Sequence, residues 1–542
     1  MTAVLLIQPP VQDFYLTAKR TFPYGLASLA AVLRNAGFSV RILDAHSRAK
    51  SRKIDLPAEL AHLGAYYARS DSSPFALFRD YRHFGYGFDH IGTEARNSGA
   101  FLVGISASFT AYHDTALATA EAVKKQHPLC RVVMGGHHAT ELPHALLASP
   151  AVDYVIRGEG ENAIVQLAET VGRGEARDPD AIRGVCFRRS DGTLKIASPV
   201  HVKDLSTLPE PALDLVSGGS YRRKGRSSAV VITSRGCPMH CSYCCVGQYS
   251  ALPYRRRNIK DVIKELDTAV YELGAGFIDF EDENLSLESA WFMELLSRIR
   301  QRFGHRNLEL RAMNGLFPAT LTAEMVAEMK AAGFKTLNLS LGSSSQKQSD
   351  RFNRPFVKRA FDKCLKWTAA EGLEAVGYII VGGPDQPPET SIDDLVFLAR
   401  RRVLAGLSVF YPAPGSQDYR RCIDLGILPS SYLAMRASAF PVDQATTRDQ
   451  AVTLMRLGRL LNFMKRLIDT GAGIPAAAPL AAKTLDPSDR TTSGRRLLAA
   501  FFDDGRIRGL SKTGEVYPHR VCRKTTDLFL TRLSGAPISG SR

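Results

Sequence analysis

The 542-residue sequence contains no apolar run long enough to cross a bilayer. Its first ten residues lack the basic start and the cleavage site of a signal peptide, and their apolar run predicts a buried strand instead. The nine cysteines do not suggest the disulfide framework of a small secreted domain. We therefore expect a cytoplasmic protein that has no membrane span and works in a reducing compartment.

The sequence also lacks a basic stripe interleaved with aromatic residues, the pattern that single-stranded nucleic acid prefers. The net charge is +16, but the basic residues form small groups, such as Arg222–Lys224, Arg255–Arg257 and Arg400–Arg402. They predict a solvated basic surface and do not favour a nucleic-acid partner. The content of 45 % hydrophobic and 23 % charged residues is typical of a soluble globular protein, and the length allows about two to four domains.

What the sequence does contain is a compact cysteine motif. Cys237, Cys241 and Cys244 follow the apolar run 229–233 with the spacing C-x3-C-x2-C. Thiolates are soft ligands that suit iron–sulfur clusters. Three cysteines leave one iron of a 4Fe-4S cluster without a protein ligand, and an open metal position is typical of catalytic rather than structural centres.

Two other interpretations of this motif stay open. A zinc site would need a fourth ligand, which could come from His240 or Cys245, and the spacing could also be a coincidence. Adjacent cysteines such as Cys244 and Cys245 bind one metal poorly, because their side chains diverge. The motif therefore favours a cluster over zinc.

Residues 1–200 alternate short apolar strands with helices, which predicts an α/β fold with a parallel, doubly wound sheet. Ligands of such sheets bind at the carboxyl ends of the strands. The stretch 50–96 is less regular and is interpreted as an insertion. The expected strands are Val4–Ile7, Val40–Leu43, Leu102–Ser106, Arg131–Met134 and Tyr154–Ile156.

Residues 220–425 contain six further strands, each of which ends in polar, glycine or proline residues. Amphipathic helices are expected between them, for instance over 323–332 and 361–371. The six strands are 229–233, 277–280, 308–311, 336–341, 375–381 and 407–410.

Together these features resemble the cobalamin-dependent radical S-adenosylmethionine (radical SAM) enzymes. The cysteine spacing, with Tyr243 before the third cysteine, is similar to the radical SAM signature. Ahead of it, five pieces are similar to the cobalamin-binding domain: Pro23–Leu26, Val40–Asp44, Gly104–Ser108, Val133–His137 and Asp153–Gly160.

This resemblance implies an architecture of three parts. They are a Rossmann-like cobalamin-binding domain over 1–200, a partial (β/α)6 radical SAM barrel over 220–425, and a small, mostly helical accessory region over 430–542. The implied cofactors are a 4Fe-4S cluster on Cys237, Cys241 and Cys244, S-adenosylmethionine (SAM) and cobalamin. The accessory region contains a helix over 451–469, an Ala- and Pro-rich linker over 474–482, and a basic tail.

The resemblance also assigns site residues. The residues expected to contact SAM are Tyr243, Glu281, Asp282, Ser340 and Gly382. Those expected to contact cobalamin are Ser106, Ser108, Thr110, Gly135, Gly136 and His137.

One position departs from the family. Its fourth barrel strand usually ends in Gly-x-Glu-Ser, but here the sequence is Gly342-Ser-Ser-Ser345, so the glutamate is missing. Ser340 or Ser344 is expected to take over the polar contact. The acid that usually follows the fifth strand is expected at Asp385 or Glu389.

Asp44-Ala-His46 resembles only in part the motif whose histidine binds cobalt in cobalamin-dependent mutases. In those proteins the motif follows the first strand, whereas the corresponding loop here is Gln8-Pro-Pro10. We therefore expect cobalamin to be held without a histidine below the metal. Cys364 and Cys522 are expected to be buried fillers, and the sequence assigns no role to Tyr254–Arg257.

The resemblance implies a radical enzyme, most simply one that methylates an unactivated carbon of a small-molecule substrate. One SAM would methylate cobalamin, and a second would supply the radical at the cluster. An external electron donor such as flavodoxin or ferredoxin is implied. The alternatives are oxidative cyclisation or rearrangement with the same cofactors, a radical SAM enzyme without cobalamin, and a non-enzymatic metal protein. Methylthio transfer to tRNA is disfavoured, because only Cys130 and Cys186 precede the motif.

Overall fold

A computed structural model describes residues 3–17, 21–48, 50–67, 69–172, 179–216, 221–246, 254–535 and 537–542. The chain divides into two compact units, neither of which is one continuous stretch. Unit 1 comprises residues 1–55, 81–236 and 250–282, and unit 2 comprises residues 56–80, 237–249 and 283–542. The predicted three segments therefore do not coincide with the compact units, and residue 220 lies outside the described residues.

The main sheet of unit 1 has the strand order β10-β9-β8-β7-β6-β1-β3. The strands β3, β1, β6, β7 and β8 run parallel to one another, and β9 and β10 add an antiparallel edge. The five predicted strands are thus confirmed. Their bounds are β1 Val4–Gln8, β3 Val40–Asp44, β6 Leu102–Ser106, β7 Arg131–Gly135, β8 Tyr154–Ile156, β9 Val185–Arg188 and β10 Leu194–Lys195.

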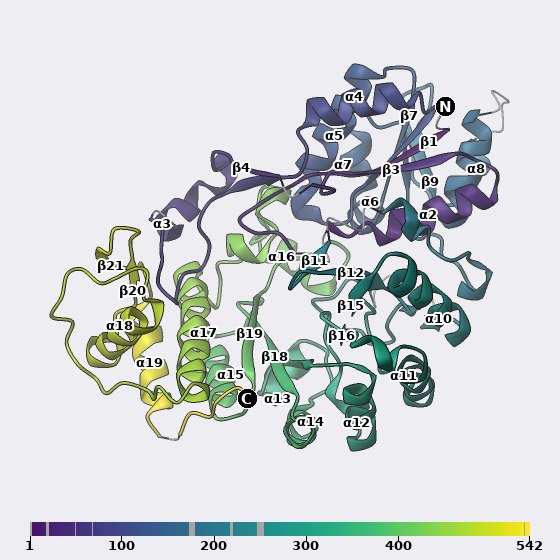
Figure 1. Ribbon diagram of the computed structural model, residues 1–542. Helices are drawn as coiled ribbons and strands as arrows, with labels where there is room; N and C mark the ends of the chain where they lie inside the picture. Colours follow the sequence, from purple (N-terminus) through teal and green to yellow (C-terminus); the bar gives the residue numbers. More distant parts are fainter. Residues whose placement is uncertain are drawn as a thin grey trace. The chain divides into compact units, whose positions relative to one another are not determined.

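Helices cover both faces of this sheet, as a doubly wound fold requires (Figure 1). Side chains of α4, α5 and α7 join one apolar core, and those of α2 and α8 join the other. The short α6 follows β7. The bounds are α2 Tyr24–Asn35, α4 Phe88–Ser98, α5 His113–Gln126, α6 His137–Glu141, α7 Pro143–Leu147 and α8 Glu161–Gly172.

Unit 1 also contains the first two predicted barrel strands, which pair in parallel so that Val231 lies beside Phe280. The short strands β13 and β14 precede and follow the cysteine loop in the sequence, and they pair as an antiparallel hairpin. The elements are β11 Arg222–Arg223, β12 Arg226–Val231, β13 Ser234–Arg235, β14 Arg255–Arg256, α10 Ile259–Asp267 and β15 Ala275–Phe280. A separate antiparallel sheet consists of β2 Val11–Asp13, β4 Ser51–Lys53 and β5 Arg82–Phe84.

Unit 2 contains the remaining four predicted strands, alternating with helices. β17, β18 and β19 form a parallel sheet, and isolated bridges place the segment around β16 beside the chain that leads into β17. The strands are β16 Glu309–Arg311, β17 Thr336–Gly342, β18 Glu374–Val381 and β19 Leu404–Val409. The helices are α11 Ser289–Phe303, α12 Ala323–Ala332, α13 Gln346–Arg351, α14 Lys358–Ala370, α15 Pro388–Ala399 and α16 Gln417–Asp424.

The C-terminal region is mostly helical, as expected. It consists of α17 Arg448–Asp469, α18 Arg490–Asp504, the hairpin β20 Arg508–Leu510 with β21 Val516–Pro518, and α19 Arg523–Leu533. Among the helices that the structure describes, none combines the length and the apolar character needed to cross a bilayer.

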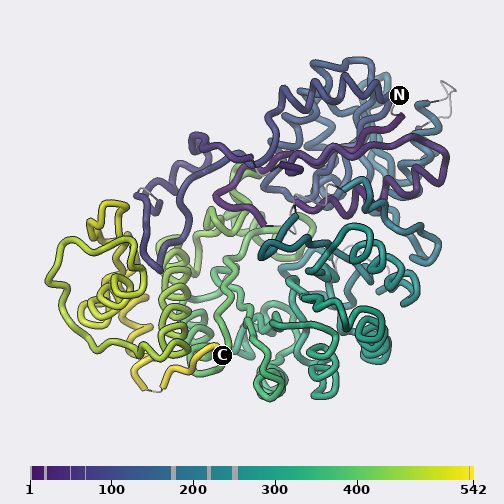
Figure 2. Tube along the Cα trace, in the orientation of Figure 1, coloured from purple at the N-terminus to yellow at the C-terminus, as the bar shows by residue number. Residues whose placement is uncertain are grey.

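The predicted insertion is divided between the units. Its central part, 56–80, with α3 Gly64–Tyr67, belongs to unit 2 and packs on the C-terminal region (Figure 2). The ring of Phe75 meets that of Phe463 in α17 at 5.6 Å, and the buried Arg456 donates to the carbonyls of Tyr66 and Phe75. A segment from the N-terminal third of the sequence thus completes the core of the C-terminal region.

Candidate active site

The cysteine loop is fixed from two sides within unit 2. The amide of Ser242 donates to the Phe352 carbonyl at 2.8 Å, and the Asn353 side chain donates to the His240 carbonyl at 2.8 Å. On the other side, the Ser242 hydroxyl donates to the buried carboxylate of Asp418 in α16, which also binds Arg351 at 2.8 Å. Cys241 is buried, Cys237 and Cys244 are half-buried, and none of the nine cysteines, all within the described ranges, forms a disulfide.

Arg354 joins three of the residues predicted from the sequence. Its Nη1 lies 3.8 Å from Sγ of Cys241 and 3.0 Å from the Tyr243 hydroxyl, and its Nη2 donates to the Ser340 carbonyl at 2.8 Å. The residue is only 9 % exposed. Although burial lowers the pKa of this guanidinium, Tyr243 and Cys241 raise it above its usual range, so Arg354 carries its charge beside the cysteine loop.

Sequence reasoning missed Arg354, because an arginine after a helix is ordinary. Tyr243 was predicted, and the structure gives it a packing role as well. Its ring meets Phe352 edge-on at 5.2 Å and packs against Phe410, Cys422 and Val442. These contacts hold the aromatic side chain against the strand ends of unit 2.

The segment after β17 has a carboxylate, although its own sequence lacks one. Asp394 of α15 accepts hydrogen bonds from the Ser343 hydroxyl at 2.9 Å and from both the amide and the hydroxyl of Ser344 at 2.6 Å. Burial raises the pKa of Asp394 to about 6. The hydroxyl of Ser344, one of the two serines predicted to compensate for the missing glutamate, is therefore engaged by Asp394.

The turn after β18 is shaped by glycine and glutamine. Gly382 has φ +73°, which favours glycine. Gln386, which is fully buried, accepts from the Gly383 amide at 2.9 Å and donates to the Ile380 carbonyl at 2.8 Å. Of the two acids predicted here, Asp385 binds Arg421 at 2.5 Å, and Glu389 is exposed.

At the end of β15 in unit 1, Asp282 is buried and holds the chain that leads to the cysteines. Its Oδ1 accepts from the amide and hydroxyl of Thr233 at 3.1 and 2.7 Å and from the Ser234 hydroxyl at 2.5 Å. Burial raises its pKa. The neighbouring Glu281 is half-buried. Asp282 thus positions β13, whereas Glu281 lies closer to solvent.

The residues predicted for cobalamin meet at the carboxyl ends of β6 and β7, where Ser106 pairs with Gly135. The hydroxyls of Ser106 and Ser108 are 3.4 Å apart. Gly136 has φ +121°, and a Cβ there would lie 2.8 Å from the Ala107 carbonyl and the Ser108 hydroxyl. A Cβ at Gly135 would meet only the Ile156 carbonyl, at an ordinary contact distance of 4.0 Å. Glycine is therefore required at position 136, whereas position 135 would accept a small side chain.

Two of the predicted cobalamin residues flank a histidine pair that the sequence did not reveal. His137 is exposed, and Thr110 lies 3.2 Å from Nδ1 of the buried His138. Nε2 of His138 lies 2.8 Å from Nδ1 of His113. Burial, with a smaller contribution from His113, lowers the pKa of His138 to about 3, so this pair is neutral and fixes the turn before α6.

His46 lies in a closed environment. Its Nε2 is 3.1 Å from the Pro9 carbonyl, so this nitrogen carries the proton, and burial lowers the pKa of the ring to about 4. Asp44 accepts from the His46 amide and from the Tyr221 hydroxyl. The expectation that His46 does not bind cobalt stays a prediction.

Among the described residues, no three His, Cys, Asp or Glu side chains are close enough to share one metal ion. Cys364 is buried, as predicted, whereas Cys522 is half-buried.

Comparison with known families decides between these interpretations. Residues 80–168 match the B12 binding domain, and residues 231–398 match the radical SAM superfamily. The chain thus carries a B12 binding domain and a radical SAM domain, the two parts that cobalamin-dependent radical SAM enzymes combine. The 4Fe-4S cluster, SAM and cobalamin are the cofactors of this family, and the residues described above fit them: three soft thiolates beside a guanidinium, and a glycine turn with adjacent hydroxyls.

Several relatives align with most of the length of this chain. It is 26 % identical over 329 residues to an uncharacterized methyltransferase of Pyrococcus horikoshii, covering 60 % of this chain and 70 % of that one. It is 24 % identical over 464 residues to cytidylyl-2-hydroxyethylphosphonate methyltransferase of Streptomyces wedmorensis, covering 78 % and 82 %. It is also 24 % identical over 382 residues to an anaerobic magnesium-protoporphyrin IX monomethyl ester cyclase of Rubrivivax gelatinosus, covering 68 % and 66 %.

The fold of the radical SAM chain is similar to that of a solved structure. The cobalamin-dependent radical enzyme OxsB, solved with aqua-cobalamin and SAM, aligns with a TM-score of 0.64 and 14 % identity, covering 93 % of this chain and 72 % of that one. The predicted fold class is thereby confirmed.

Proposed function

We propose that this enzyme methylates an unactivated carbon of a small-molecule substrate, using a 4Fe-4S cluster, SAM and cobalamin. The observation that carries the proposal is that one chain combines the Arg354-braced cysteine loop with the glycine turn of a B12 binding domain. Two relatives that match 60 % and 78 % of the chain are named methyltransferases.

In this proposal Cys237, Cys241 and Cys244 hold the cluster and leave one iron for SAM. When bound, the cluster and SAM would supply a carbon radical that removes hydrogen from the substrate, and cobalamin would supply the methyl group. Arg354, beside Cys241, would bind the SAM carboxylate through its charged guanidinium. Tyr243, Ser340 and Gly382, which lie in the same unit as Arg354, would line this site. The contact of Glu281 with SAM stays a prediction from the sequence.

Asp282 is proposed to act mainly by holding Thr233 and Ser234, because its best contacts are already made with them. Its direct contact with SAM stays a prediction. For cobalamin, the side-chain-free backbone at Gly135 and the hydroxyls of Ser106 and Ser108 would accept the nucleotide tail. Thr110 and His137 would lie at the rim of the same turn.

The cellular setting stays a prediction. A radical enzyme of this kind needs one-electron reduction of its cluster, so an external donor such as flavodoxin or ferredoxin is proposed. Nucleic acid is not proposed as a substrate, and a cytoplasmic location is expected from the sequence.

The test is product analysis with methyl-deuterated SAM. Anaerobically reconstituted enzyme with cobalamin, a reductant and candidate small-molecule extracts should transfer a labelled methyl group and release 5′-deoxyadenosine. Cys241→Ala should abolish both products while retaining the corrinoid absorption bands. Release of 5′-deoxyadenosine without any labelled product would contradict methylation but not the radical chemistry.

A second candidate is oxidative cyclisation or rearrangement. It is favoured by the similarity to the Rubrivivax cyclase, which aligns with 68 % of the chain. It predicts a product without added carbon. A third, a radical SAM enzyme that does not use cobalamin, predicts no corrinoid bands after incubation with hydroxocobalamin.

A further inference from the structure

The hairpin around the cysteine loop places two positive charges face to face. In the pairing of β13 with β14, Arg235 lies directly opposite Arg255. Like charges opposite each other destabilise a strand pair. Arg235 stands two residues before Cys237, so anything that opens this hairpin also releases the start of the cluster loop. The hairpin therefore needs a source of negative charge.

Two glutamates supply that charge. Glu159 binds both terminal nitrogens of Arg255 at 2.9 Å and lies 3.5 Å from Arg235, and Glu161 binds Arg235 at 2.6 Å. The four side chains are 5–22 % exposed, so solvent does not screen them effectively. Removal of one partner from a buried network leaves an uncompensated charge.

Both glutamates come from the cobalamin-binding part of unit 1. They follow β8, the neighbour of β7 in the main sheet, and Glu161 opens α8, where the helix dipole favours a carboxylate. Glu159 also accepts from the Val202 amide at 2.6 Å, and Arg255 donates to the Val202 carbonyl. The connecting segment around Val202 is thereby included in the same network.

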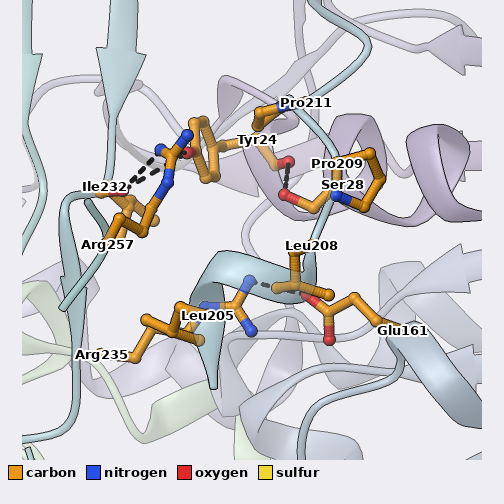
Figure 3. A pocket seen from close by; sticks show the side chains of 10 residues that line it. All are labelled: Tyr24, Ser28, Glu161, Leu205, Leu208, Pro209, Pro211, Ile232, Arg235 and Arg257. Atoms are coloured by element: carbon orange, nitrogen blue, oxygen red, sulfur yellow. Dashed lines mark hydrogen bonds and ion pairs between the residues drawn. The ribbon is translucent and has the colours of Figure 1, made fainter. Parts of the chain in front are cut away.

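A second group of charges lies beside the first (Figure 3). Arg257 donates to Glu265, to the Ile232 carbonyl at 3.1 Å and to the Tyr24 hydroxyl at 3.1 Å. Arg235, Glu161, Arg257 and Tyr24 line one small cavity, together with apolar residues that include Leu205, Leu208 and Ile232. The Arg255–Arg257 run, to which the sequence assigned no role, thus connects the cluster hairpin to α2 and α10.

We propose that Glu159 and Glu161 are positioning residues for the iron–sulfur cluster: they neutralise Arg235 and Arg255 and so fix the start of the cysteine loop to the cobalamin-binding sheet. The proposal rests on the proposed function for its catalytic meaning, but the anchoring itself does not depend on the substrate. The two glutamates act on the cysteine loop through Arg235 and Arg255.

The test uses the full-length holoenzyme with Glu161→Gln and Arg235→Met. We expect each variant to retain cobalamin, as judged by its visible spectrum. Amide hydrogen exchange of β13 and β14 should be at least about tenfold faster than in the wild type, because the hairpin opens more often. The iron and sulfide content after reconstitution should fall by about half or more, and reductive release of 5′-deoxyadenosine should fall with it.

A matched control is Arg34→Met. Arg34 forms a bidentate pair with Asp214 at 2.9 Å in the same unit, but the two side chains are 40 % and 56 % exposed. It should change neither exchange nor iron content. The conservative variant Glu161→Asp, which keeps a carboxylate at the start of α8, should show exchange closer to that of the wild type than Glu161→Gln does, which a merely space-filling role would not explain.

Unchanged exchange and iron content in both single variants would overturn the proposal, and so would equal losses in Arg34→Met. If a single variant lost cobalamin as well and did not fold, Glu161→Asp would decide: exchange and iron content near those of the wild type support anchoring by charge, and losses equal to those of Glu161→Gln contradict it. Absence of SAM cleavage by the wild type would refute the proposed function, while the exchange data would still test the anchor.

Discussion

Arg354 places a positive charge beside the cysteine loop. It is buried and contacts Cys241, Tyr243 and Ser340 at once. Replacement by methionine keeps the apolar stem and removes the donors, so the loop should keep its packing. The site should lose one charge-assisted interaction with SAM.

We predict that Arg354→Met raises the dissociation constant for SAM by about 10- to 100-fold, since a hydrogen bond to a charged group contributes roughly 1.5–3 kcal/mol. Equilibrium dialysis of the reconstituted enzyme measures this constant. The iron content should stay near that of the wild type. The exposed Arg298, which pairs with Glu294 on α11, provides the control variant Arg298→Met. Unchanged SAM affinity in Arg354→Met would remove Arg354 from the SAM site.

The buried His138 makes unit 1 sensitive to acid. Burial lowers the pKa of His138 from 6.5 to about 3. Between pH 3 and pH 6.5 the ring is therefore protonated in the unfolded chain but neutral in the folded chain. Stability contributed by the neutral ring is therefore present above pH 6.5 and is lost as the pH falls. From pH 7 to 5.5 the loss from this residue should be roughly 1 kcal/mol.

Urea unfolding at pH 7 and 5.5, followed by the bands of bound cobalamin, measures this loss. His138→Gln can still hydrogen-bond its neighbours but does not titrate, so it should show a smaller acid loss than the wild type. The variant of the exposed His144, His144→Gln, should behave like the wild type. An equal acid loss in His138→Gln would mean that other groups cause it.

At the scale of elements, the turn between β7 and α6 offers a matched pair of glycines. Gly136 has a positive φ and no space for a Cβ, whereas Gly135 has space. Gly136→Ala should therefore lower the free energy of unfolding by about 1–3 kcal/mol and weaken cobalamin binding. Gly135→Ala should leave the free energy of unfolding within about 0.5 kcal/mol of that of the wild type. Any loss of cobalamin binding would then come from a direct clash between the new methyl group and the ligand.

Chemical denaturation with and without cobalamin separates these two effects. If Gly136→Ala were as stable as the wild type, this would contradict the close approach of the turn to Ala107 and Ser108. If Gly135→Ala bound cobalamin as tightly as the wild type, Gly135 would not be part of the cobalamin site.

The elements themselves were largely predictable. Runs rich in Val, Ile or Leu, such as Val4–Ile7 and Thr336–Leu341, form strands because a parallel sheet buries both faces, and the structure has them at these places. The cysteine spacing and the glycine turn were also readable, since both are local patterns. What sequence reasoning missed depends on distant partners: Asp394 reaches Ser343 and Ser344 from another helix, and Glu159 reaches Arg255. No local pattern encodes such pairs.

The division into units was the least predictable feature. The aromatic residues of the insertion suggested irregularity, but nothing local indicates that Phe75 packs on Phe463. Long-range packing of this kind follows from the fit of two surfaces, which a single sequence does not display.

At the scale of the whole molecule, the two units can be followed separately. Both tryptophans, Trp291 and Trp367, lie in unit 2, whereas the residues proposed for cobalamin lie in unit 1. Arg456 of α17 is 2 % exposed and donates to carbonyls of the 56–80 segment. Its loss leaves those carbonyls without a partner and creates a cavity.

We predict that Arg456→Met destabilises unit 2 by about 3 kcal/mol, the size expected when a buried charged hydrogen-bonding group is removed. The tryptophan fluorescence transition should shift to lower urea, and the corrinoid transition should shift less. Arg466→Met, at an exposed position of the same helix, is the control. Equal shifts of both transitions in Arg456→Met would show that the units unfold together.

The interleaving of the two units has a consequence for synthesis on the ribosome. Phe75 and Arg456 are 381 residues apart. At about 5–20 residues per second, the early segment emerges roughly 20–80 s before the helix that buries it has been made. Until then its aromatic side chains have no native cover, so a nascent chain of this enzyme should depend on a holding chaperone, and slow translation should lower its soluble yield.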